Sequence, residues 1–166
     1  MKKIKTVYIG MSADIIHHGH MKLLEEARKY GKIIIGLFTD AAVAEYKRVP
    51  YLNYKQREKI LKNFQGVVKV IAQKEWDYST NVKKLKPDFF IHGDDWKRGY
   101  MGNIRKNVLK ALKSYGGKLI EIPYTKDISS SALVDNQNSL SITPDIRRGI
   151  FRRLVESKKI SRYLET

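Results

Sequence analysis

Short apolar runs alternate along the chain with stretches in which apolar residues recur every three or four positions. The runs predict five strands, at Thr6–Met11, Lys32–Phe38, Val67–Ala72, Asp88–His92 and Lys118–Pro123. The periodic stretches predict helices over residues 55–64, 80–85 and 104–115, and a first helix that begins within the histidine cluster at residues 17–20 and ends before Gly31. Wholly apolar strands that alternate with amphipathic helices are typical of a parallel sheet covered on both faces. The pattern therefore predicts an open α/β fold.

The chain changes character beyond Leu133, where the apolar periodicity ends and a polar run follows. Thr143-Pro144-Asp145 then supplies the N-cap, the first-turn proline and the acid that begin a helix. We expect a domain over residues 1–134, a polar linker over 135–143 and a basic amphipathic helical tail over 144–166. Because one short helix is a weak membrane anchor, we expect the tail to pack on the domain or on a partner subunit.

Composition narrows the class of protein further. The chain has 166 residues, 42% of them hydrophobic, and no cysteine, which excludes disulfide scaffolds, thiol catalysis and cysteine-ligated zinc. The first residues show no signal-peptide pattern, and no apolar run is long enough to cross a bilayer. We therefore expect a cytoplasmic protein with no membrane partner.

The formal charge of +16 suggests an anionic partner, which could be nucleic acid, acidic lipid or a small phosphate compound. Residues 145–166 carry seven Lys and Arg against three Asp and Glu, and the remaining excess is spread over the chain. No basic and aromatic stripe of the kind that binds RNA is evident. We therefore favour a solvated basic surface, and keep a non-catalytic nucleotide- or nucleic-acid-binding module as the alternative from another class.

Three of the four histidines lie within residues 14–20, directly after the first predicted strand. His17 and His20 are three positions apart and so share one side of the first helical turn. Gly19 lets a ligand approach the backbone closely, and the helix N-terminus adds free N–H groups and a positive dipole end. The cluster predicts a phosphate-binding site. A zinc site, which would need a further ligand, and purely structural histidines are the alternatives.

This His-x-Gly-His segment, with a strand before it and a helix after it, resembles the signature of the nucleotidylyltransferase superfamily. Four blocks in the same order resemble its cytidylyltransferase branch: Asp14–His20, Tyr54–Arg57, Gly93–Trp96 and Ile128–Ser131. Over residues 1–134 the chain is similar to the glycerol-3-phosphate, phosphocholine and phosphonate cytidylyltransferases. The resemblance implies the nucleotidylyltransferase fold, a Rossmann-like open parallel sheet flanked by helices.

The resemblance also implies a reaction, in which a phosphate or phosphonate oxygen attacks the α-phosphorus of CTP and pyrophosphate leaves. In that reaction His17, His20 and Lys47 would be catalytic, with Arg48 as the rival of Lys47 in neutralising the transition state. Arg48 and Arg57 would hold the acceptor. The nucleotide-binding residues implied are Ser12, Asp14, Gly19, Gly93, Asp94, Asp95, Trp96, Ile128, Ser129, Ser130 and Ser131. Mg²⁺ would accompany the nucleotide, and Asp14 is a candidate either to ligate it or to orient a histidine. An ATP-dependent enzyme on the same fold is a further alternative.

Two features of the sequence suggest the acceptor: the resemblance of the tail, and two positions at which the chain differs from glycerol-3-phosphate cytidylyltransferases. Residues 142–157 resemble the stretch that leads into the phosphoenolpyruvate mutase domain of fused phosphonate enzymes. Gln65 and Tyr124 stand where glycerol-3-phosphate cytidylyltransferases are expected to carry arginines. We therefore expect 2-aminoethylphosphonate as acceptor and association with a mutase domain, with phosphocholine, phosphoethanolamine and glycerol-3-phosphate as the alternatives. Family resemblance also predicts a homodimer.

Overall fold

The structure is a computed structural model that describes residues 4–46, 48–97 and 99–123 together with Leu133. The chain divides into two units, Met1–Ser130 and Ser131–Thr166, and the strands and helices named below belong to the first. The predicted linker and basic tail, residues 135–143 and 144–166, lie outside the described residues.

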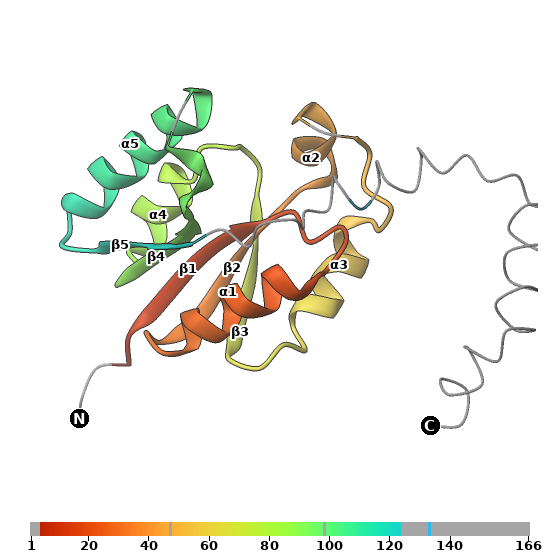
Figure 1. Cartoon of the computed structure of the whole chain (residues 1–166), viewed down its shortest axis with the longest axis horizontal. Coiled ribbons are helices and arrows are strands. Elements are labelled where there is room, and N and C mark those ends of the chain that lie inside the picture. The colour runs from red at the N-terminus through yellow and green to blue at the C-terminus, as the bar shows by residue number, and fades with distance from the viewer. Residues whose placement is uncertain (1–3, 47, 98, 124–132, 134–166) are drawn as a thin grey trace, which may run out of the picture. The chain divides into compact units, whose positions relative to one another are not determined.

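Five parallel strands form one sheet in the order β3-β2-β1-β4-β5, and Figure 1 shows helices on both of its faces. The strands are β1 (Thr6–Met11), β2 (Lys32–Phe38), β3 (Val67–Gln73), β4 (Phe89–Gly93) and β5 (Lys118–Ile122). The chain adds β2 and β3 on one side of β1, then returns to place β4 on the other side. The predicted open α/β fold and all five strands are confirmed, with bounds that differ by one residue at most.

The helices include four that the periodicity predicts and one that it does not. The predicted helices are α1 (His18–Arg28), α3 (Tyr54–Leu61), α4 (Ser79–Leu85) and α5 (Gly99–Lys113). The unpredicted helix is α2 (Asp40–Tyr46), and a short 3₁₀ turn, η1 (Asp94–Trp96), follows β4. Thr39 begins α2, because its Oγ1 accepts the N–H of Ala42 at 3.3 Å and Asp40 stands in the first turn.

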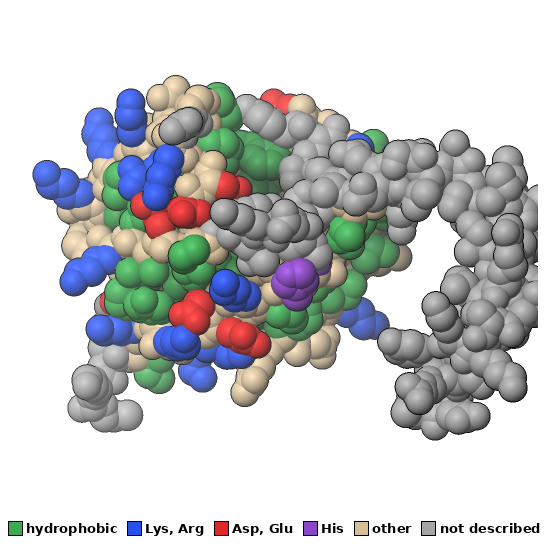
Figure 2. Space-filling view, in the orientation of Figure 1, with side chains coloured by type: hydrophobic (Ala, Val, Ile, Leu, Met, Phe, Trp, Pro, Cys, Tyr) green, Lys and Arg blue, Asp and Glu red, His purple; other side chains and the backbone are tan. Residues whose placement is uncertain are grey.

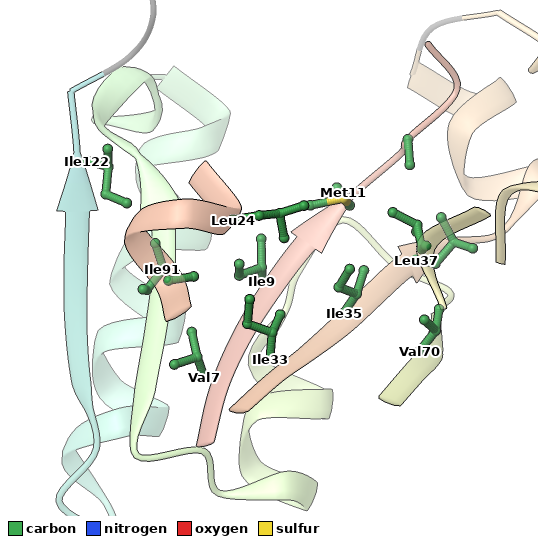
Figure 3. Packing of buried hydrophobic residues seen from close by; sticks show 13 residues of the cluster. Val7, Ile9, Met11, Leu24, Ile33, Ile35, Leu37, Val70, Ile91 and Ile122 are labelled. Carbon is green, nitrogen blue, oxygen red and sulfur yellow. The ribbon is translucent and has the colours of Figure 1, made fainter. Parts of the chain in front are cut away.

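Alternate residues of the strands build two cores, one on each face of the sheet. On one face the strands pack against Leu24 and Ala27 of α1 and Leu61 of α3, as Figure 3 shows for Leu24. On the other face an aromatic core with Tyr8 and Tyr78 packs against α4 and α5. Because both faces are covered, the central strands are apolar along their whole length.

Glycines let the aromatic core lie flat against the sheet. A Cβ atom at Gly36 would lie 1.8 Å from Oη of Tyr8, and one at Gly10 would lie 2.1 Å from the Tyr78 ring. Side chains at these two strand positions would therefore push the tyrosines out of the core.

Among the helices that the structure describes, none has the length and apolar character to cross a membrane. Figure 2 shows that lysine and arginine side chains on the visible face are interleaved with acidic and apolar ones. Whether this basic surface is merely solvated or binds an anionic partner stays a prediction.

Candidate functional site

The carboxyl ends of β1 and β4 lie side by side at the point where the strand order reverses. β1 pairs with β2 on one side and with β4 on the other, and Tyr8 is in register with Phe90. The connections after these two adjacent strands run to opposite faces of the sheet. In open α/β sheets this arrangement forms a crevice at the carboxyl ends of the strands, and ligands bind there. The histidine segment follows β1 and the η1 turn follows β4, so both begin at this crevice.

His17 and His20 come together at the start of α1, as their spacing predicts. His17 is the N-cap residue, and the two imidazole centroids are 3.9 Å apart with an angle of 48° between the rings. The backbone N–H of His17 donates to Nδ1 of His20 at 3.3 Å. Nδ1 of His20 is therefore an acceptor, so a neutral His20 carries its proton on Nε2 and can donate from there. Contact of either ring with a triphosphate stays a prediction.

Several predicted residues lie outside the described part of the chain. These are Lys47, the predicted transition-state cation, and Ile128, Ser129, Ser130 and Ser131, the predicted binders of the β and γ phosphates. Their roles stay predictions. Lys47 is nevertheless bonded directly to Arg48, whose position the structure gives.

Asp14 holds a loop and does not contact the histidines. Its neighbour Ala13 has a φ of 51°, in the left-handed region that side chains rarely adopt. The Asp14 carboxylate accepts the N–H of Tyr51 at 2.7 Å and that of Leu52 at 3.4 Å through Oδ1. Its Oδ2 lies 2.6 Å from Nη2 of Arg48. Asp14 thus joins the turn after β1 to the loop before α3.

These contacts use part of the accepting capacity of the Asp14 carboxylate, whose two oxygens offer about four lone-pair sites. The described residues include no group of three His, Cys, Asp or Glu that could hold a metal. Asp14 thus holds the loop, and its predicted role in orienting a histidine or ligating Mg²⁺ stays a prediction.

Arg48 lies between Asp14 and the ring of Tyr51. Its guanidinium carbon is 3.8 Å from the Tyr51 ring centroid, and Nη1 donates to the Val49 carbonyl at 3.1 Å. About a third of the side chain, 34%, is exposed. Arg48 thus keeps a surface for an anion beside the site, and its predicted role in acceptor binding stays a prediction.

Arg57 differs from its prediction, because it is completely buried among protein acceptors. Nε donates to the Leu52 carbonyl at 2.9 Å, Nη2 donates to Oδ1 of Asp40 at 2.6 Å, and Nη1 donates to the Ser12 carbonyl. A guanidinium in this position cannot reach a dissolved acceptor. Arg57 instead ties the turn after β1, the start of α2 and the start of α3 together.

The segment Gly93–Trp96 borders the crevice, but its tryptophan does not. Trp96 is only 1% exposed, and its Nε1 donates to Oε1 of Glu121 at 2.9 Å. The predicted contact of Trp96 with a nucleotide is thus replaced by a core role. Asp94 is half-buried and Asp95 is exposed, so both can still face a ligand. Gly19 is half-buried on α1 and stays a predicted binder.

The sequence motifs do not include His92, the histidine that precedes this segment. Its Nδ1 lies 2.8 Å from the Gly93 carbonyl, and its ring stacks on Trp96 with 4.0 Å between centroids. Burial lowers the pKa of His92, although the Gly93 carbonyl and the carboxylates of Asp95 and Glu121 act in the opposite direction. The sequence feature that could have identified His92 is its position at the end of a predicted strand, since ligands of open α/β sheets bind at strand ends.

Fold and site together define a doubly wound α/β protein in which two imidazoles meet at the start of α1, directly after β1. Open sheets of this class bind ligands at the carboxyl ends of the strands where the strand order reverses. The sequence profile of the Cytidylyltransferase-like family matches residues 8–136, so the chain belongs to that family. The similarity to glycerol-3-phosphate cytidylyltransferases is confirmed. The resemblance to phosphonate enzymes fused to a mutase stays a prediction.

Individual relatives agree with this assignment. The chain is 33% identical to glycerol-3-phosphate cytidylyltransferase of Bacillus spizizenii over 142 residues, which cover 84% of this chain and 100% of the relative. It is 30% identical to ethanolamine-phosphate cytidylyltransferase of Dictyostelium discoideum over 135 residues, 80% of this chain and 36% of that relative. The lipopolysaccharide core biosynthesis protein of Thermoplasma volcanium has the same fold, with a TM-score of 0.63 at 22% identity over 75% of this chain and 100% of that one.

Proposed function

We propose that the chain is a cytidylyltransferase that joins CMP from CTP to a small phosphate monoester and releases pyrophosphate. The observation that carries this proposal is the pair His17 and His20, 3.9 Å apart at the crevice between β1 and β4. Membership of the Cytidylyltransferase-like family supports cytidine as the base.

The proposed acceptor is a phosphate monoester the size of glycerol-3-phosphate or phosphoethanolamine. The two relatives named for these acceptors support it better than the tail resemblance supports 2-aminoethylphosphonate. A phosphonate nevertheless offers the same attacking oxygen, so it belongs among the acceptors tested.

The residues described suit this chemistry through positioning and charge. The acceptor oxygen attacks the α-phosphorus, and negative charge develops on the pyrophosphate that leaves. His20 donates from Nε2, because Nδ1 is held as an acceptor by the N–H of His17. A donor fixed in advance stabilises this charge without reorganising in the transition state. Lys47, next to the anchored Arg48, would supply a second positive group.

Mg²⁺ would enter this proposal bound to the phosphates of CTP, where it neutralises charge. The described residues offer it no carboxylate cluster. None of the steps above is assigned to it.

The test is pyrophosphate release by the full chain with CTP and each of glycerol-3-phosphate, phosphoethanolamine and 2-aminoethylphosphonate. The same assays with ATP in place of CTP test which nucleobase the protein uses. We expect turnover with CTP and a phosphate monoester. His20→Ala removes the donor and should lower kcat by roughly 10²–10³-fold, the usual effect of losing one such group. His18→Ala is the matched control, because His18 is exposed and should leave the rate within a factor of about three.

Three results would count against the proposal. Absence of turnover with all three acceptors would refute the proposal. Turnover with ATP but not with CTP would show that the nucleotide substrate is ATP. Equal losses in His20→Ala and His18→Ala would show that the histidine pair is not the reacting site.

A further inference from the structure

His92 is held by several specific contacts, and it has no part in the roles proposed for His17 and His20. It is the fourth residue of β4 and stands one position before the end of the strand, at the crevice. Its ring is nearly parallel to that of Trp96, at 11° and 4.0 Å between centroids, and to that of Phe90, at 6°. Rings on the same core face therefore hold the imidazole in one orientation.

The hydrogen bond at Nδ1 decides which nitrogen of His92 carries the proton. The Gly93 carbonyl, 2.8 Å from Nδ1, can only accept, so Nδ1 must donate. Because burial lowers the pKa of His92, the ring is neutral at physiological pH and Nε2 holds a lone pair. Within the described ranges of the chain no group donates to Nε2, and 14% of the side chain stays exposed.

A chain of contacts fixes the plane of this imidazole. Trp96, on which His92 stacks, donates from Nε1 to Oε1 of Glu121 at 2.9 Å. Glu121 is held in turn by Arg105, whose Nε and Nη2 donate to its two oxygens at 2.9 Å each. An acceptor held this firmly loses little entropy when it forms a hydrogen bond with a ligand.

We propose that His92 is a specificity residue of the nucleotide site, whose Nε2 accepts a hydrogen bond from an N–H or O–H donor of the bound nucleoside. This inference rests on the proposed function, which places CTP in the crevice. A neutral acceptor discriminates by chemistry, because the amino group of cytosine donates whereas the carbonyl oxygen at the same position of uracil does not. The ribose 2′- and 3′-hydroxyls are the other nucleoside donors of this kind.

The test is calorimetric binding of CTP, UTP and dCTP to the full chain and to His92→Phe, which keeps an aromatic ring against Trp96 but has no lone pair. We expect CTP to bind His92→Phe roughly tenfold more weakly, the effect of one lost hydrogen bond. If the cytosine amino group is the donor, UTP binding should be unchanged and the preference for CTP over UTP should shrink. If the 2′-hydroxyl is the donor, binding of CTP and UTP should weaken together while dCTP binding is unchanged. If the 3′-hydroxyl is the donor, all three ligands should bind more weakly by the same factor.

Tyr115→Phe is the matched control, because it also removes one polar group from an aromatic side chain of the same core face. Within the described residues the Tyr115 hydroxyl is buried without a hydrogen-bond partner, so its loss should leave all three affinities unchanged. Equal affinities of wild type and His92→Phe for CTP, UTP and dCTP would overturn the inference.

A spectroscopic measurement on the unaltered chain covers the case in which His92→Phe does not fold. Nitrogen NMR should show Nε2 of His92 unprotonated at pH 7 and shifted on addition of CTP. A protonated Nε2, or one that CTP leaves unmoved, would overturn the inference. Failure of wild type to bind CTP would refute the proposed function itself, whereas normal turnover with an unmoved Nε2 would refute only the role of His92.

Discussion

At the scale of single residues, Asp14 decides where the loop beside the histidines lies. Its side chain is only 7% exposed, and it accepts from Arg48 at 2.6 Å and from the N–H of Tyr51 at 2.7 Å. Lys47 precedes Arg48 directly in the chain. We therefore expect the loss of this one carboxylate to affect both the stability of the fold and the position of the predicted catalytic lysine.

The variant Asp14→Asn keeps the shape of the side chain but removes its charge. We expect the free energy of unfolding to fall by about 2–3 kcal/mol, because a buried charge-assisted contact is lost. We also expect kcat for pyrophosphate release to fall, since Arg48, which follows the predicted catalytic Lys47 in the sequence, loses its carboxylate partner. Urea denaturation and steady-state kinetics measure the two effects.

Glu26→Gln is the matched control, since Glu26 also pairs with a cation at 2.6 Å but on the surface, where Lys29 is 65% exposed. Exposed pairs contribute little, so the control should change stability by less than about 0.5 kcal/mol. Similar changes in the two variants would show that Asp14 does not hold the loop.

At the scale of elements, Arg57 and Asp40 join the starts of α2 and α3. Asp40 accepts the N–H of Tyr54 through Oδ2 at 3.1 Å and pairs with Arg57 through Oδ1 at 2.6 Å. Asn53 caps α3 through the N–H of Gln56 at 3.1 Å. The two short helices therefore depend on tertiary contacts more than on their own length.

Arg57→Lys tests whether this arginine holds structure or substrate. A lysine cannot reproduce three divergent donations, so we expect the free energy of unfolding to fall by about 2–4 kcal/mol. The exposed Arg28→Lys should have almost no effect. If Arg57 instead bound the acceptor, as the motif implies, Arg57→Lys would raise KM for the acceptor and leave urea denaturation unchanged.

Local patterns were enough to predict the strands and four helices, because a strand buried on both faces has to be apolar along its length. The helix α2 was missed because its apolar residues form one continuous run, Ala41–Ala44, and do not recur every three or four positions, although Thr39 and the alanines after it are favourable signals. The histidine pair was predictable from spacing. The burial of Arg57 and Trp96 was not, because their partners Ser12 and Glu121 lie 45 and 25 positions away.

At the scale of the whole molecule, two groups of the aromatic core make stability depend on pH in separate ranges. The hydrogen bonds from Arg105 hold the pKa of Glu121 at about 2, below its ordinary value of 4.5. Burial holds the pKa of His92 below its ordinary 6.5. In both cases the unfolded chain takes up the proton at a higher pH than the folded chain does, so acid favours unfolding.

We therefore expect the free energy of unfolding to decrease in two steps as the pH falls. The first begins below 6.5, where His92 is protonated only in the unfolded chain. The second runs from about 4.5 to about 2, where Glu121 loses its charge. Urea denaturation at a series of pH values measures both steps.

Variants assign the two steps to their residues. Glu121→Gln should lower stability at pH 7 by about 2 kcal/mol, since the bond to Arg105 is no longer between charges, and should reduce the second step alone. His92→Phe should reduce the first step and leave the second in place. Because Trp96 stacks on His92 and donates to Glu121, its fluorescence reports the unfolding of this core in the urea titration at each pH. A response of both steps to Glu121→Gln alone would mean that the two groups titrate as one unit, and that the tryptophan between them transmits the change.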